Sequence, residues 1–163
     1  SVGLKRMKQG EVMVCICSSP DAVNGGKVVY LGSLRYRAVA SPDFIEQYTI
    51  NRTTDLQQAP CLVFDHNDRT QHEFLLQHAK FEPEYIHWCP SSEGFNQAML
   101  AGLGYGMLPE LQIADSIGTG KLVDLFPGEC MDIPLYWHYW QTESPYLQAL
   151  REYAVNAAKA YLV

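Results

Sequence analysis

The sequence of 163 residues lacks any apolar run of about 18 residues, and its N-terminus lacks the apolar segment of a secretory signal. These two absences exclude the usual membrane and secretion signals, so we expect a cytoplasmic protein without a membrane partner. The sequence is also poor in positive charge, with 12 Lys and Arg against 18 Asp and Glu and a formal net charge of -6. Because a surface that binds a phosphate backbone needs clustered Lys and Arg, this chain is not expected to bind DNA itself.

Paired cysteine motifs are also missing. The five cysteines form no Cys-x-x-Cys pair and have no Cys/His spacing suited to zinc; they are Cys15, Cys17, Cys61, Cys89 and Cys130. An odd number without such motifs argues against a disulfide framework and against a structural metal. We expect reduced and mostly buried thiols, with Cys15 and Cys17 on the same face of one strand.

Motifs for nucleotide binding and for serine catalysis are absent as well. The glycines of Gly102-x-Gly104-x-Gly106 follow a predicted helix and precede a predicted strand, which reverses their order in a dinucleotide-binding motif. No Gly-x-Ser-x-Gly elbow occurs, and Ser91 has no neighbour in the sequence that would act as its base. We therefore expect no cofactor and no enzymatic activity.

Two groups of reactive side chains have plainer explanations than catalysis or metal binding. His87 and Cys89 would lie on one side of a strand, which permits a Cys–His pair, but a buried strand face is the more common reason for such spacing. Asp65, His66 and Asp68 offer one imidazole and two carboxylates, a pattern that more often follows the end of a strand than binds a metal. Neither group predicts a catalytic or metal site.

The residues that are present alternate between apolar strands and amphipathic helices, which predicts an α/β fold. Apolar or aromatic runs predict strands at residues 11–17, 28–31, 34–40, 61–64, 85–88, 105–108, 122–125 and 133–140. Caps and apolar periodicity predict helices at residues 53–59, 70–80, 92–102, 111–116 and 145–161. The apolar run at 11–17 is typical of a strand that is buried on both faces in a parallel sheet. The order of the elements suggests two lobes.

The segment around Ser91 predicts a site for an anion. Pro90 ends the strand before it, and Ser91 or Ser92 is suited to cap the helix that follows. The apolar face of that helix is marked by Phe95, Met99 and Leu103. Hydroxyls and free backbone N–H groups at the positive end of a helix attract a carboxylate. The alternative is a capped helix without a ligand.

Acidic residues follow a neighbouring strand. Asp65 and Asp68 come directly after the buried strand at 61–64, and ligands of open α/β sheets bind at the carboxyl ends of the strands. These carboxylates favour a cation, whereas the helix that starts near Ser91 favours an anion. A zwitterion with an extra positive group, such as lysine or arginine, satisfies both.

Several segments together resemble one family. Residues 4–12, 31–36, 39–44 and 135–138, with Phe-Asp-His-Asn-Asp at 64–68 and Ser-Ser-Glu-Gly-Phe at 91–95, are similar in order and spacing to one kind of domain. It is the effector-binding domain of LysR-type transcriptional regulators, in their ArgP-like branch. The run Ala-Gly-Leu-Gly-Tyr-Gly-Met-Leu-Pro at 101–109 resembles the general LysR-type pattern. The resemblance spans nearly the whole chain.

The resemblance implies a fold of the type II periplasmic-binding-protein kind, in which two crossing strands join two α/β subdomains and a small effector binds in the cleft between them. We place subdomain I at residues 1–44 and 128–163, without the first strand and helix of the family, and subdomain II at residues 45–127. The resemblance also implies DNA binding through an N-terminal helix-turn-helix outside this sequence. The full-length protein is expected to be a homodimer or a homotetramer.

The predicted function is effector sensing, in which bound lysine or arginine controls how the full-length protein binds DNA and regulates transcription. We expect the α-carboxylate near Ser91 and Ser92 and the cationic end near Asp65 and Asp68, with Glu93 as the next acid. The predicted ligand-binding residues are Ser18, Ser19, Ser41, Asp65, Asn67, Asp68, Ser91, Ser92 and Glu93. Two alternatives remain open, an extracytoplasmic solute-binding protein and a small α/β enzyme that uses Cys89.

Overall fold

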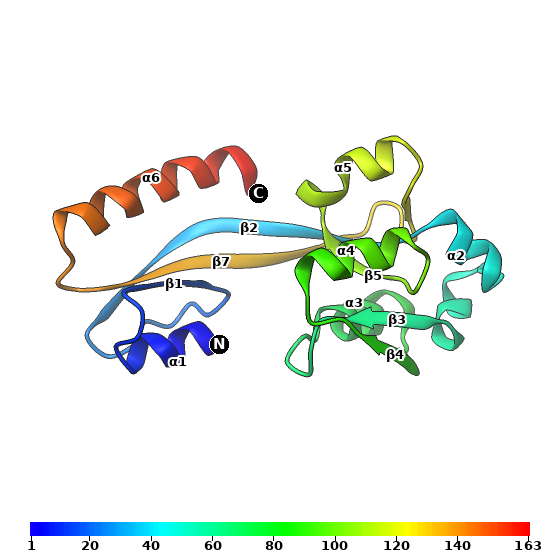
Figure 1. Ribbon diagram of the computed structural model, residues 1–163, viewed down its shortest axis with the longest axis horizontal. Helices are drawn as coiled ribbons and strands as arrows, with labels where there is room; N and C mark the ends of the chain where they lie inside the picture. Colours follow the sequence, from blue (N-terminus) through cyan, green and yellow to red (C-terminus); the bar gives the residue numbers. More distant parts are fainter. The chain divides into compact units, whose positions relative to one another are not determined.

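The computed structural model describes residues 1–163, and Figure 1 shows their helices and strands. The helices are α1 (Val2–Lys8), α2 (Pro42–Gln47), α3 (Thr70–Ala79), α4 (Ser92–Leu100), α5 (Glu110–Gly118) and α6 (Pro145–Tyr161), and Thr53–Gln58 forms the 3-10 helix η1. The strands are β1 (Val14–Cys17), β2 (Gly26–Ala40), β3 (Pro60–Val63), β4 (Tyr85–Trp88), β5 (Gly106–Pro109), β6 (Val123–Asp124) and β7 (Met131–Trp140). This alternation confirms the predicted α/β class. None of the helices combines the length and the apolar character needed to cross a membrane.

The chain divides into two compact units. Unit 1 consists of residues 1–35 and 132–163, and unit 2 is the continuous segment 36–131. Strands β2 and β7 carry the chain from one unit to the other. The subdomain limits expected from the sequence, 1–44 with 128–163 and 45–127, differ from these divisions by several residues and stay a prediction.

In unit 1, β1 pairs antiparallel with β7, and Cys15 lies opposite His138. The face of β1 that carries Cys15 packs against α1 in a small core that includes Met7. Ile16, on the other face, is 52% exposed. The prediction of a parallel strand buried on both faces at 11–17 is therefore wrong, because an antiparallel pair needs a cover on one face only.

Strand β2 is longer than expected. The sequence predicted two strands here, but β2 continues through Gly32 and Ser33. Gly32 has a φ of +132°, and a Cβ at this position would lie 2.7 Å from the Cβ of Leu162. Ser33 exchanges two backbone hydrogen bonds with Val163, at 2.8 and 3.0 Å. The glycine therefore does not end the strand, and its missing side chain makes room for the C-terminal residues.

Unit 2 contains the parallel part of the fold. Strands β3 and β4 pair in parallel, and Tyr105, just before β5, forms a parallel bridge with Cys61 of β3. Strand β5 also pairs antiparallel with β2. Every residue of β3 and β5 is buried, as their apolar sequences predicted. Phe74 and Leu75 of α3 pack with residues of β3 and β5 in the larger core of this unit.

Helix α4 differs from the prediction at its C-terminal end. Phe95 and Met99 are buried as expected, but Leu103 is 56% exposed. The helix ends at Leu100, and Gly102 has a φ of +76°, so the chain turns before Leu103 is reached. Leu103 therefore does not belong to the apolar face of α4.

All five cysteines are free thiols, as predicted. Cys15 and Cys61 are buried and the other three are half-buried, so the expectation that most of the thiols are buried is wrong. Cys15 and Cys17 share one face of β1, because side chains alternate along a strand and Ile16 lies between them. Burial raises the pKa of the Cys61 thiol far above its ordinary range.

Candidate ligand-binding site

Three helices of unit 2 begin at the ends of three strands. After β3, β4 and β5 the chain continues into α3, α4 and α5, respectively. These three strands run in the same direction, so their carboxyl ends lie at one edge. Each helix start leaves backbone N–H groups without partners inside the helix and carries a partial positive charge. Open α/β sheets bind their ligands at such an edge.

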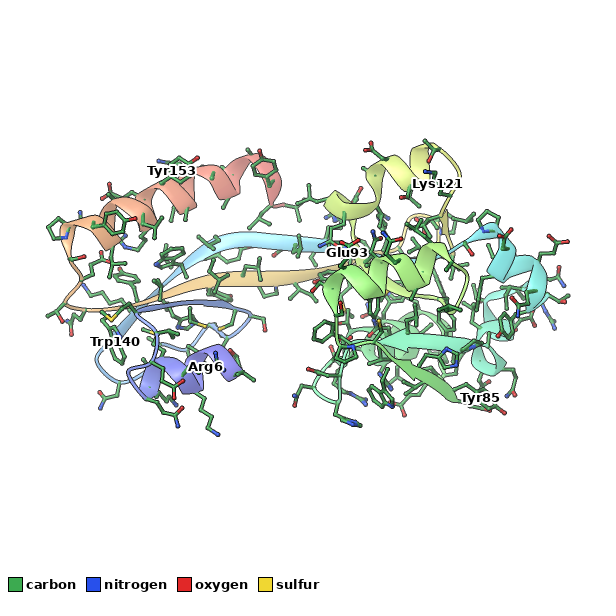
Figure 2. All side chains as sticks on the ribbon, viewed as in Figure 1. Arg6, Tyr85, Glu93, Lys121, Trp140 and Tyr153 are labelled. Atoms are coloured by element: carbon green, nitrogen blue, oxygen red, sulfur yellow. The ribbon has the colours of Figure 1, made fainter.

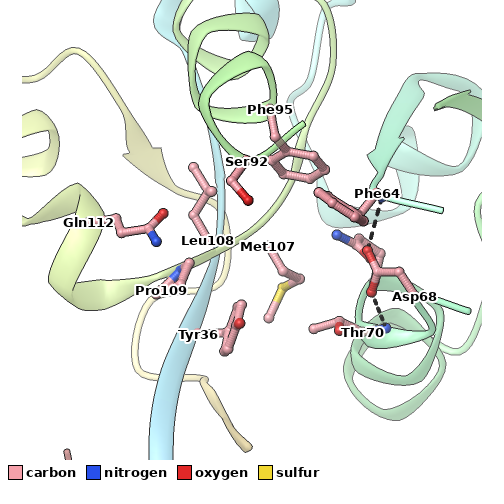
Figure 3. Close-up of a pocket in the computed structure, with 11 residues that line it drawn as sticks. Tyr36, Phe64, Asp68, Thr70, Ser92, Phe95, Met107, Leu108, Pro109 and Gln112 are labelled. Atoms are coloured by element: carbon pink, nitrogen blue, oxygen red, sulfur yellow. Dashed lines mark hydrogen bonds between the residues drawn. The ribbon is translucent and has the colours of Figure 1, made fainter. Parts of the chain in front are cut away.

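A cavity of about 270 Å³ lies at this edge (Figure 3). Its polar lining consists of Tyr36, Asp68, Thr70, Gln71, Ser92 and Gln112. Its apolar lining consists of Phe64, Phe95, Met107, Leu108 and Pro109. Asp68 is the one charged residue of the lining. The other polar residues of the lining are Tyr36 and residues from the first turns of α3, α4 and α5. The cavity thus combines one carboxylate with three helix N-termini.

Asp68 fixes the loop between β3 and α3 and also lines the cavity. Its Oδ2 accepts a hydrogen bond from the N–H of Phe64 at 3.1 Å, and its Oδ1 accepts one from the N–H of Thr70 at 3.0 Å (Figure 3). A carboxylate oxygen has two acceptor positions, so each oxygen keeps one for a ligand. The loop therefore holds Asp68 in place without using up its capacity to bind a cation.

Tyr36 of β2 adds an uncharged donor to the cavity. Burial raises the pKa of its phenol above the ordinary value of 10.0, and the negative charge of Asp68 raises this pKa further. The phenol therefore stays protonated at neutral pH, and its O–H remains available to donate to an oxygen of a ligand.

Helix α4 contributes its N-terminus to the site. Ser91 is the N-cap, as predicted, and its Oγ accepts a hydrogen bond from the N–H of Gly94 at 3.1 Å. Ser92 lines the cavity. Glu93 is exposed on the first turn of α4 (Figure 2). It accepts a hydrogen bond from Nε2 of Gln97 at 3.0 Å. Ser91 is not part of the lining, so Ser92 is the hydroxyl of this pair that borders the cavity.

The other two polar residues predicted in the loop after β3 do not line the cavity. Asp65 Oδ1 accepts hydrogen bonds from the N–H groups of Asn67 and Asp68, at 2.8 and 3.1 Å. Asn67 is exposed. Asp65 therefore shapes the turn that presents Asp68, and a direct contact of Asp65 or Asn67 with a ligand stays a prediction.

The three remaining predicted serines lie elsewhere in the structure. Ser18 and Ser19 belong to unit 1, where the carbonyl of Ser19 accepts a hydrogen bond from Nε2 of His138 at 2.8 Å. Ser41 is 3% exposed and caps α2, with its Oγ accepting from the N–H of Phe44 at 3.2 Å. The structure thus brings Asp68 and Ser92 together at one cavity, with Ser41 outside its lining. The binding roles of these three serines stay predictions.

Sequence reasoning missed four polar residues of the lining, which are Tyr36, Thr70, Gln71 and Gln112. Gln71 carried a signal in the sequence, because Phe74 and Leu75 follow it at three and four residues and place it on the apolar face of α3. A polar residue on such a face is unusual. Tyr36 and Gln112 carried no comparable signal, since their position depends on how β2 and α5 pack.

His87 and Cys89, which the sequence offered as a Cys–His pair, lie outside the lining of the cavity. His87 is exposed, with its Nδ1 3.0 Å from the carbonyl oxygen of Leu103. The expected buried strand face at this position is therefore wrong. Cys89 is half-buried. No group of three or more His, Cys, Asp or Glu side chains is placed to hold a metal ion.

Two α/β units, with a cavity at the carboxyl ends of parallel strands in one of them, define an α/β domain of the periplasmic-binding-protein-like kind. Comparison with protein families matches residues 3–159 to the LysR substrate binding domain. The chain belongs to this family.

Curated relatives point to one branch of the family. The chain is 41% identical, over all of its length, to the HTH-type transcriptional regulator ArgP of Pseudomonas fluorescens. It is 43% identical, over 99% of its length, to the protein of the same name in Pseudomonas aeruginosa. It covers 55% of each of these relatives, so it spans about half of their length.

Solved structures agree with this assignment. The C-terminal domains of a LysR family protein from Agrobacterium tumefaciens match with a TM-score of 0.92 and 34% identity, over 98% of this chain and 79% of that one. ArgP from Mycobacterium tuberculosis matches with a TM-score of 0.89 and 29% identity, over 97% of this chain and 55% of that one. Full-length LysG from Corynebacterium glutamicum with bound effector arginine matches with a TM-score of 0.85 and 32% identity, over 98% and 55%. The chain is a LysR-type regulatory domain similar to those of ArgP proteins.

Proposed function

We propose that this chain is the effector-sensing domain of a LysR-type transcriptional regulator, and that the effector is a basic amino acid, arginine or lysine. The observation that carries the proposal is the cavity in unit 2, which one carboxylate and three helix N-termini line. Asp68 attracts a positive group, and the helix N-termini attract a negative one. The arginine bound to LysG and the likeness to ArgP proteins support the same ligand class.

In the proposed complex, the α-carboxylate of the effector lies near Ser92 and Ser91, where helix-terminal N–H groups donate charge-assisted hydrogen bonds. The cationic end faces Asp68, with Asp65 behind it as the second acid of the loop. Glu93 and Asn67 are the nearest further polar groups that the sequence predicted. The lining contains no Lys or Arg, so an effector whose charge is mainly negative has no partner there.

The activity of the whole protein is proposed from its relatives. They are named HTH-type regulators and are about twice as long as this chain, so we place DNA binding in a helix-turn-helix outside the chain. Effector binding here would change how that part binds DNA in a homodimer or homotetramer. The regulator would work in the cytoplasm and would perform no catalysis.

Isothermal titration calorimetry of the chain with arginine, lysine, norleucine and glutamate tests the ligand class. Norleucine keeps an aliphatic side chain but lacks the second positive charge, and glutamate replaces that charge by a negative one. We expect arginine and lysine to bind at least about tenfold more tightly than the other two, since each 1.4 kcal/mol of lost interaction is a factor of about ten. Equal affinity for glutamate would overturn the proposal.

Asp65→Ala and Asp68→Ala form a matched pair for the site. Each carboxylate accepts two backbone hydrogen bonds in the same loop, but only Asp68 lines the cavity. Losing a buried partner of a charge costs about 2 to 5 kcal/mol, so Asp68→Ala should weaken arginine binding by more than about tenfold. Asp65→Ala should weaken binding less than Asp68→Ala does, because it removes a carboxylate that holds the loop but lies outside the lining of the cavity. Equal losses in both variants would mean that the loop, and not the carboxylate of Asp68, carries the binding.

A further inference from the structure

Gln71 is a buried polar residue at the wall of the cavity. It is the second residue of α3 and is 2% exposed. Its neighbours on the same face of the helix, Phe74 and Leu75, belong to the hydrophobic core. A buried side-chain amide normally pairs all of its strong donors and acceptors, because leaving them unpaired costs free energy. The Gln71 side chain makes no hydrogen bond within the chain, and its Oε1 is buried without a partner.

The two ends of this amide have different surroundings. Oε1 is completely enclosed. Gln71 also borders a gap on the core side, next to Tyr105 and Gly106, which has no room for a water molecule. The oxygen and the nitrogen of an amide point in different directions from its carbon, and Nε2 is not among the enclosed atoms. The open space that Gln71 borders is the cavity, so Nε2 is the end that reaches it.

We propose that Gln71 is a specificity-determining residue, whose Nε2–H group donates a hydrogen bond to the carboxylate of the bound effector. This role rests on the proposed function. It adds that the cavity selects ligands with a free carboxylate, and that Gln71 makes this selection. The lining has no Lys or Arg to neutralise a carboxylate. Uncharged N–H donors must therefore stabilise the carboxylate of the ligand. The Gln71 amide and the N–H groups at the start of α4 are such donors.

Calorimetry with arginine and agmatine isolates this contact, because agmatine keeps the guanidinium and lacks the carboxylate. Gln71→Met keeps an unbranched side chain of similar length and removes the amide. A hydrogen bond to a charged group is worth a factor of about ten to a hundred in affinity, so Gln71→Met should weaken arginine binding by that factor. Agmatine binding should change by about twofold or less. Gln77→Met makes the same change at an exposed position of the same helix and should leave both ligands unaffected.

The same titrations separate the possible failures. If Gln71→Met weakens arginine and agmatine by the same factor, or weakens neither, Gln71 does not bind the carboxylate and the inference is overturned. If the unsubstituted chain binds neither compound, the proposed function fails and the role of Gln71 fails with it. Thermal unfolding checks that the variant is folded. Since Gln71→Met removes unpaired polar atoms from a buried site, it should unfold at or above the temperature of the unsubstituted chain.

Discussion

His72 is a buried histidine of unit 2, and we expect it to make the stability of the unit depend on pH. It follows Gln71 on α3, is buried, and has no hydrogen-bond partner for Nδ1. Burial lowers the pKa of its imidazole below the ordinary value of 6.5, and the positive charge of Arg69 lowers this pKa further. Between that lowered pKa and 6.5, the unfolded chain binds more protons than the folded chain does. The free energy of unfolding should therefore fall as the pH falls through this window.

Urea unfolding between about pH 7.5 and pH 5 measures this dependence. We expect His72→Gln to flatten the part of the slope below about pH 6.5, because the variant has no imidazole to protonate at that position. His66→Gln, at an exposed position, is the control for removing an imidazole from the surface. A slope that His72→Gln leaves unchanged would show that His72 does not couple folding to pH.

Single residues of the site were predictable where the signal is local. Ser92 and Asp68 were found because a helix cap and a polar strand end can both be recognised within a few residues of sequence. The different roles of Asp65 and Asp68 could not be predicted, because both carboxylates follow the same strand and only the fold of the loop decides which one reaches the cavity. Gln71 could have been found from the helical spacing of Phe74 and Leu75, which places it on the apolar face of α3. The position of Tyr36 at the cavity depends on tertiary packing and could not.

At the scale of elements, the close packing of β3 against the segment before β5 limits what Gly104 can tolerate. A Cβ on Gly104 would lie 2.8 Å from Cγ of Leu62 and 3.0 Å from the carbonyl oxygen of Pro60. Gly104→Ala should therefore lower the free energy of unfolding by about 1 to 3 kcal/mol, the usual cost of overpacking. Chemical denaturation of the variant and of the unsubstituted chain measures this difference in the free energy of unfolding.

Gly118→Ala is the matched control for this substitution. Gly118 ends α5, and a Cβ there would meet nothing within 4 Å. Because alanine favours a helix more than glycine does, this variant should be as stable as the unsubstituted chain or more stable by up to about 1 kcal/mol. If both alanine variants had the same stability, the close approach of the strands would not be what requires a glycine at position 104.

Two strands that are buried on both sides were predicted well from the sequence. Strands β3 and β5 follow from continuous apolar runs, since each is buried over its full length. Strand β1 has a similar run, but its pairing with β7 is antiparallel and one of its faces stays exposed. The sequence of a strand does not say which strand it pairs with. The apolar run at 11–17 therefore could not show whether one face or both faces of the strand are buried.

At the scale of the whole molecule, the five thiols report on the two units separately. Cys15 and Cys17 lie in unit 1, and the other three lie in unit 2. Burial raises the pKa of both Cys15 and Cys61, so these two should be the slowest to react with an alkylating reagent in the native chain. Mass spectrometry should find five modified residues after denaturation. A disulfide in the natively purified chain would contradict both the structure and the expected cytoplasmic location.

The central claim about the whole molecule is that a basic amino acid binds where α3, α4 and α5 begin. The most direct test is a titration of the ¹⁵N-labelled chain with arginine, followed through the backbone amide shifts, with norleucine as the control ligand. The account predicts that the amides of Thr70, Ser92 and Gln112 shift together and saturate with a single dissociation constant, and that norleucine moves them much less. Saturable shifts elsewhere in the chain, with these three amides unmoved, would contradict it.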